Sequence, residues 1–153
     1  MMPANAQQKF VRLLGENGHR LTTQKRAVLQ ALFEHDRSHL TVEEIYECAK
    51  NILPSISIAT VYRAVSFLEQ AKILRKLRTD DKHHCYELIH PDEPEGHPHC
   101  ICTQCGKTFG ITESSVAHLF TVCKQAVESR YHFRIDLQNI LYYGLCETCH
   151  GRT

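Results

Sequence analysis

The sequence contains no long apolar run and does not open on one. A helix needs about 20 consecutive apolar residues to cross a bilayer, and the 153 residues contain no run of that length. The opening segment MMPANAQQKFVRLLGENG is polar and lacks the apolar centre of a secretion signal. We therefore expect a cytoplasmic protein that spans no membrane and whose cysteines stay reduced.

The sequence also lacks the signatures of common enzyme classes. It has no His-Glu-x-x-His zinc motif, no glycine-rich phosphate loop and no nucleophile elbow. A zinc hydrolase needs an open metal position with a general base beside it, whereas the cysteines described next predict a closed site. We therefore expect neither catalysis nor a small-molecule substrate.

Cysteine is abundant: there are eight, and four of them form two Cys-x-x-Cys pairs. Cys102 and Cys105 lie on a predicted tight turn, and Cys146 and Cys149 lie near the end of the sequence. Four thiolates on two such turns fit tetrahedral zinc, with metal–sulfur distances of roughly 2.3 Å. We predict a closed, structural zinc site, with redox-active or free thiols as the alternative.

Two histidines precede the first cysteine pair in the segment GHPHCICTQCG. On an extended strand His97 and His99 point to the same side, and two imidazoles on one face suit a second, divalent metal. This metal needs further ligands, for which we consider Glu87 and His39. An ordinary surface or hydrogen-bonded histidine at each position is the alternative.

The first half of the sequence is basic and has helical periodicity. Residues 1–82 hold 13 Lys and Arg against 9 Asp and Glu, whereas residues 83–153 hold 5 against 8. Thr41 and Glu44 form a capping box, and caps are also predicted at Thr22 or Thr23 and at Ser55 or Ser57. Apolar spacing predicts four helices, within residues 7–18, 21–35, 40–53 and 55–73.

Two segments with period-two alternation follow, ILRKLR and CYELI, separated by the polar turn TDDKHH. Helices followed by a hairpin are typical of a winged helix-turn-helix, in which the fourth helix enters the major groove of DNA. The outer face of that helix carries Ser57, Thr60, Tyr62 and Arg63, whose side chains can contact phosphates and base edges. The alternative is a solvated face on a plain helical bundle.

The segment LIHPDEPEGHP, with three prolines, predicts a hinge between two domains. Beyond it, HCIC and KTFGI are predicted strands, residues 112–130 a helix beginning near Thr112 or Ser114, and residues 133–146 a strand. The fold class is α+β, with a winged-helix domain at 1–89, a hinge at 90–96 and a small α/β domain at 97–153. The second domain has little apolar area, so a metal or a partner subunit would help to stabilise it.

Several segments together resemble the ferric uptake regulator family of metalloregulators. They are HRLTTQKRAVLQAL, HLTVEEIY, SIATVYRAVSFLEQAKIL, YEL, HPHCICTQCGK and YYGLCETC, in the family's order and spacing. The resemblance implies a repressor that forms a homodimer through its C-terminal sheet and binds a palindromic, A/T-rich operator when loaded with metal. It assigns Arg20 to the minor groove, and Tyr62 and Arg63 to the recognition helix.

The resemblance also assigns the metal ligands. It places Cys102, Cys105, Cys146 and Cys149 in the family's structural zinc site, and His39, Glu87, His97 and His99 in its regulatory site at the hinge. Many members have a carboxylate at the position of Gly110, which this sequence lacks. Cys85, Glu113 and His118 are the residues considered for completing the site.

The metal that is sensed is iron(II) by family frequency, with zinc next because Cys85 shares the side of the strand that carries Glu87. Manganese is also accepted by this donor set. A peroxide-responsive member is the third possibility, because such members usually present aspartates where this sequence has Glu87 and Gly110. A DNA-binding protein whose only metal is the structural zinc is a more distant alternative.

Overall fold

The computed structural model describes residues 2–16, 20–78, 84–90 and 96–151. The chain forms two compact units, Met1–Pro91 and Asp92–Thr153. Most of the segment predicted as a hinge and most of the turn predicted between the two hairpin strands lie outside the described residues. Within those residues, no helix has the length and apolar character to span a membrane.

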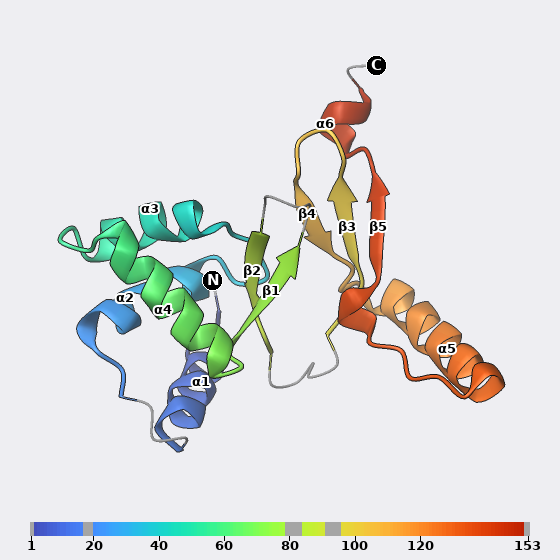
Figure 1. Cartoon of the computed structure of the whole chain (residues 1–153), viewed down its shortest axis with the longest axis horizontal. Helices are drawn as coiled ribbons and strands as arrows, with labels where there is room; N and C mark the ends of the chain where they lie inside the picture. The colour runs from blue at the N-terminus through green and yellow to red at the C-terminus, as the bar shows by residue number, and fades with distance from the viewer. Residues whose placement is uncertain (1, 17–19, 79–83, 91–95, 152–153) are drawn as a thin grey trace. The chain divides into compact units, whose positions relative to one another are not determined.

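The first unit consists of four helices and a two-stranded antiparallel hairpin, which is the winged helix-turn-helix arrangement predicted from the sequence (Figure 1). Helix α4 packs on α2, on α3 and on strand β1. The elements are α1 (Ala4–Glu16), α2 (Thr23–Glu34), α3 (Val42–Ile52), α4 (Ile58–Gln70), β1 (Leu74–Arg78) and β2 (His84–Leu88).

Local hydrogen bonds determine where three of these helices begin. Thr22, Thr41 and Ser57 each accept a hydrogen bond from the backbone N–H three residues later. Glu44 completes a capping box by accepting the backbone N–H of Thr41 at 2.8 Å. The predicted capping box is confirmed, and the other two predicted caps are resolved to Thr22 and Ser57.

Helix α4 stops abruptly and leads straight into the hairpin. The N–H of Ile73 bonds the carbonyl of Leu68 at 2.9 Å, and the N–H of Lys72 bonds that of Glu69 at 3.0 Å. This pair of bonds is a Schellman motif, with Lys72 in the left-handed conformation at φ 55°. The helix and β1 are therefore joined by only three residues, 71–73.

The core of the first unit is formed by the inner faces of the four helices and the apolar side chains of the hairpin. Apolar residues on these helices that lie outside the core are Val11, Leu13, Ile52 and Ile58, each 38% exposed. Ile56, in the turn before α4, is buried and takes the inner position instead of Ile58. The exposed residues of α4 are Ile58, Ala59, Tyr62, Arg63, Ser66 and Gln70.

The second unit is a three-stranded sheet with one long helix. Strand β3 is central; it pairs antiparallel with β4 and parallel with β5, as Figure 1 shows. The elements are β3 (His99–Cys102), β4 (Thr108–Gly110), α5 (Ser114–Tyr131), the short 3-10 helix η1 (Leu137–Asn139), β5 (Leu141–Gly144) and α6 (Glu147–His150).

Three details of the second unit differ from the prediction. Glu113, rather than Thr112 or Ser114, caps α5, because its carboxylate accepts the N–H groups of Ser115 and Val116. The last strand is shorter than predicted and covers only Leu141–Gly144. The one-turn helix α6, which carries the last cysteine, was not predicted.

The alternating residues Phe133, Ile135 and Leu137 do not form a strand. The N–H of Ile135 bonds the Glu128 carboxylate at 2.7 Å, and Leu137 begins the 3-10 helix. Strand β3 already has a partner on each side, and none of the described strands pairs with this segment.

Candidate metal centres and nucleic-acid interface

The first Cys-x-x-Cys turn, residues 102–106, is called the first knuckle below. Cys102 ends β3, and the N–H of Gly106 bonds its carbonyl at 2.9 Å, which closes the turn around Cys105. Gly106 adopts φ 73°, a conformation that is strained for a residue with a side chain. The glycine therefore allows both thiols to turn toward the same side.

The second knuckle is residues 146–149. Parallel pairing of β3 with β5 sets Cys102 opposite Gly144, and the N–H of Thr103 bonds the Gly144 carbonyl at 2.8 Å. Cys146 follows two residues later and begins the single turn of α6, which carries Cys149. Strand pairing thus brings together two knuckles that are 41 to 44 residues apart.

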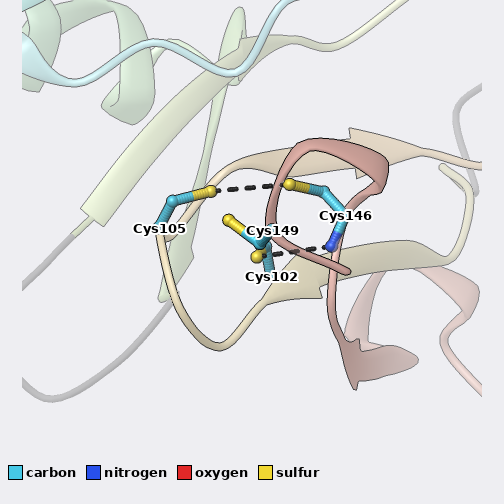
Figure 2. A group of neighbouring side chains, drawn as sticks. All are labelled: Cys102, Cys105, Cys146 and Cys149. Carbon is cyan, nitrogen blue, oxygen red and sulfur yellow. Dashed lines mark hydrogen bonds between the residues drawn. The ribbon is translucent and has the colours of Figure 1, made fainter. Parts of the chain in front are cut away.

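Figure 2 shows the four sulfurs turned toward one another, all within 4.8 Å. The Sγ atoms of Cys105 and Cys146 are 3.7 Å apart, far longer than a disulfide bond of roughly 2.05 Å. Metal–sulfur bonds of roughly 2.3 Å in a tetrahedron give sulfur–sulfur separations of roughly 3.8 Å. The donors and their spacing therefore fit a tetrahedral zinc ion with no open position.

The electrostatics of the cluster also favour a cation. Backbone N–H groups of Cys146 and Cys105 lower the pKa of Cys102 to about 6, so this sulfur is a thiolate at neutral pH. Burial, together with the neighbouring thiols, raises the pKa of Cys149 to about 12. Four thiolates cannot accumulate here unless a positive charge compensates them, which is what a bound zinc ion supplies.

A second group of candidate ligands lies in the first unit. Leu40 and Tyr86 exchange backbone hydrogen bonds of 3.0 and 2.8 Å, which fixes the residue before Leu40 beside β2. There Nε2 of His39 lies 3.0 Å from Oε2 of Glu87, and both side chains are 3% exposed. Arg75 binds the other carboxylate oxygen of Glu87 at 2.8 Å.

The sequence analysis did not predict the ion pair of Arg75 with Glu87, although the hairpin register could have indicated it. It lies directly opposite Glu87 in the hairpin register, so aligning the two predicted strands pairs opposite charges. The buried carboxylate is thus shared between an imidazole and a guanidinium. Nitrogen and oxygen donors of this kind suit a first-row divalent metal.

The remaining two predicted regulatory ligands lie in the second unit. The ring centroids of His97 and His99 are 4.6 Å apart, as expected for side chains on the same side of an extended segment. His99 is fully buried and pairs with Gly110 across β3 and β4. A carboxylate at position 110 would lie opposite His99 and could serve as a metal ligand. Gly110 has no side chain, so this position offers no ligand here.

That His39 and Glu87 share one ion with His97 and His99 stays a prediction. Of the residues considered for completing that site, Cys85 is buried on β2, whereas His118 is exposed on α5. The carboxylate of Glu113 is already engaged as the cap of α5.

The predicted DNA-contacting residues lie in the first unit. Tyr62 and Arg63 are exposed on α4, and Arg20 is exposed just before α2. Thr60 is only half-exposed, and its Oγ1 accepts a hydrogen bond from Nη2 of Arg63 at 3.3 Å and lies 2.9 Å from Oγ of Ser57. Its placement suits orienting Arg63 more than projecting from the helix.

The phenol of Tyr62 is held by a residue that the sequence analysis missed. Its hydroxyl donates a 2.7 Å hydrogen bond to Oε1 of Glu43, on the preceding helix α3. This bond raises the pKa of Tyr62 and lowers the pKa of Glu43, so the carboxylate is ionised at neutral pH. No local pattern predicts the contact, since it depends on how α3 packs against α4.

The second unit exposes an unusual amount of apolar surface. No residue of α5, which is described in full, is buried, and the outer strand β5 is mostly exposed. Large apolar side chains that are more than a third exposed are Phe109, Val116, Leu119, Val122, Tyr131, Phe133, Tyr142, Tyr143 and Leu145.

Comparison with known proteins agrees with this architecture. The model of the "Ferric uptake regulator family" matches residues 16–140. The ferric uptake regulation protein of Bacillus subtilis is 29% identical over 139 residues, covering 91% of each chain. The peroxide-responsive repressor of Staphylococcus saprophyticus is 30% identical over 139 residues, covering 91% of this chain and 88% of the relative.

Among solved structures, a ferric uptake regulator of Francisella tularensis with iron is similar to this chain. It superimposes with a TM-score of 0.69 at 27% identity, covering 87% of this chain and 96% of that one.

Proposed function

Since the chain belongs to the ferric uptake regulator family, we propose that it is an iron-responsive repressor that binds a palindromic, A/T-rich operator as a metal-loaded homodimer in the cytoplasm. Members of this family are transcription regulators rather than enzymes. The observation that carries the proposal is the position of His39 and Glu87: two buried metal-binding groups 3.0 Å apart within the DNA-binding unit itself.

The regulatory ion in this proposal is held by His39, Glu87, His97 and His99. The two pairs come from the two units, so an ion that needs all four ligands is bound only when the two units supply them together. A ligand shifts an equilibrium between two arrangements only if it binds one of them more tightly. Metal occupancy would therefore favour one arrangement of the DNA-binding units.

Iron(II) is the proposed metal because the ligands are nitrogens and a carboxylate, and because the similar proteins include iron regulators. Zinc is the next candidate, since the Cys85 thiol is buried on the same strand as Glu87. Manganese suits the same donors. A peroxide-responsive role is supported by the 30% identity to the Staphylococcus saprophyticus repressor.

The proposed homodimer forms through the second unit. Strand β5 pairs only with β3 among the described strands, so its outer edge is open for another strand. The apolar side chains of α5 and β5 would be covered in such a pair, and a small unit with an exposed apolar face gains most from association.

Metal titration of operator binding tests the function. With the structural zinc in place, under anaerobic and reducing conditions, we expect iron(II) to raise the affinity of the protein for an A/T-rich palindrome at least about tenfold. Parallel titrations with manganese and zinc rank the metals, and sedimentation of the same samples measures the dimer mass. If no metal changes the operator affinity, the protein is a DNA-binding protein whose only metal is the structural zinc.

Two arginine variants test the DNA interface. Arg63→Ala should weaken operator binding by about 1–3 kcal/mol and relax sequence preference, if its guanidinium contacts a base edge. Arg20→Ala should weaken binding mainly to sites with A/T-rich flanks, because a narrow minor groove concentrates negative potential around an inserted cation. Fluorescence anisotropy with matched duplexes measures both effects.

The matched control is Arg130→Ala, which removes an exposed positive charge from the second unit. It should change binding little. Operator affinities of the Arg63 and Arg20 variants that equal the affinity of this control would contradict the proposed docking of α4.

A further inference from the structure

From the bond between α3 and α4 we infer that Glu43 is a positioning residue for Tyr62, and that it raises the discrimination between operator and other DNA while lowering the affinity for both. This inference rests on the proposed binding of α4 to DNA. It assigns a role to a residue on α3 that is expected to touch no base.

The first step concerns the orientation of the Tyr62 ring. Tyr62 is 48% exposed and lies on the outer face of α4, so packing alone restrains it weakly. The 2.7 Å bond to Glu43 joins side chains 19 residues apart and fixes the ring relative to two helices. Because an ordered side chain loses less freedom on binding, the bond reduces the entropic cost of presenting this ring to DNA.

Glu43 is itself well anchored. It lies in the first turn of α3, whose start is fixed by the capping box of Thr41 and Glu44. A negative charge is favourable at a helix N-terminus, so the ionised carboxylate is stabilised where it stands. The backbone that carries the acceptor is therefore fixed, and the exposed Glu43 side chain reaches the phenol from the first turn of α3.

The second step concerns what Tyr62 can still do. A phenol has one O–H donor, and in this structure Glu43 takes it. With its donor engaged, Tyr62 cannot donate to a phosphate, which is a contact that every DNA sequence offers. What it presents is the ring, whose apolar contact with a thymine methyl depends on the base sequence.

The third step concerns charge. A carboxylate beside the exposed face of α4 repels phosphates of any sequence, so it lowers specific and non-specific affinity together. On operator DNA the oriented ring gains a contact that offsets this repulsion. On other DNA there is no such gain, and the discrimination between the two increases.

A double-mutant cycle tests the inference, with Glu43→Ala, Tyr62→Phe and the pair of substitutions together. For each protein, metal-loaded and at fixed salt, dissociation constants are measured for the operator duplex and for a shuffled duplex of equal composition. We expect Glu43→Ala to tighten binding to the shuffled duplex and to lower the discrimination ratio about three- to tenfold. Tyr62→Phe should lower the ratio similarly, and the double variant no further than the larger single effect.

Two additional variants separate positioning from charge. Glu47→Ala removes an exposed carboxylate one turn further along α3, so it should tighten binding to both duplexes equally and leave the ratio unchanged. Glu43→Gln keeps an acceptor for the phenol and loses the charge, so its discrimination ratio should be closer to that of the wild type than to that of Glu43→Ala. The inference is overturned if Glu43→Ala leaves the discrimination ratio unchanged, as Glu47→Ala does. It is also overturned if the effects of Glu43→Ala and Tyr62→Phe on the ratio add in the double variant. Wild-type protein without any discrimination would instead contradict the proposed function itself.

Discussion

Replacing Cys102 or Cys149 with serine should remove one tightly held zinc ion per chain and destabilise the second unit. Both side chains are buried at the junction of the two knuckles, and each supplies a quarter of the coordination shell. Structural zinc in small domains contributes roughly 10–16 kcal/mol of apparent binding free energy at neutral pH, and this free energy is coupled to folding. Metal analysis and thermal unfolding of the full chain measure the two effects.

Cys123→Ser is the matched control, because this thiol is exposed on α5 and lies outside the cluster. It should keep its zinc and its melting temperature. A Cys102 or Cys149 variant that retains full zinc content and a wild-type melting curve would falsify the four-cysteine assignment. It would also mean that zinc does not stabilise the second unit, although none of the described residues of α5 is buried there.

The double substitution of His97 and His99 by alanine should abolish the response to metal while leaving the structural zinc in place. The two imidazoles are half of the proposed regulatory ligands, and an ion bound by the other two would hold nothing in the second unit. A tenfold effect of metal on operator affinity corresponds to about 1.4 kcal/mol of coupling, within the range of known allosteric systems. Operator affinity measured against free metal gives the comparison.

His132→Asn is a suitable control, since it removes an exposed imidazole of the same unit and asparagine tolerates the left-handed conformation found there. This variant should respond to metal like the wild type. If the double variant still switches with the wild-type midpoint, the regulatory ion lies elsewhere, and Cys85 and His118 are the next residues to replace.

Features that depend on a few neighbouring residues were predictable from the sequence. The capping box of Thr41 and Glu44 and the turn between Cys102 and Cys105 involve atoms three or four residues apart. Two Cys-x-x-Cys pairs also constrain each other, because zinc requires four ligands. These patterns predicted the helices of the first unit and the four-cysteine cluster.

Features that depend on a distant partner were not predictable. The alternation of Phe133, Ile135 and Leu137 suits a strand, but a strand forms only where a neighbouring strand pairs with it, and none of the described strands pairs with this segment. The contacts of Glu43 with Tyr62 and of Arg75 with Glu87 likewise depend on how separate elements pack. A periodic pattern predicts whether a segment is a helix or a strand, whereas strand pairing and side-chain contacts depend on which elements pack beside it.

The sheet order of the second unit has a consequence for the time course of synthesis. Strand β3 pairs with β4 a few residues away but with β5 only after the intervening helix has been made. At about 5–20 residues per second, the sequence separation of 41 from Cys105 to Cys146 takes roughly 2–8 s to synthesise. During that interval a growing chain presents the first knuckle as a two-thiol site. A zinc ion bound then would have only two sulfur ligands from the chain, so the closed four-sulfur site forms only after β5 and α6 have been made.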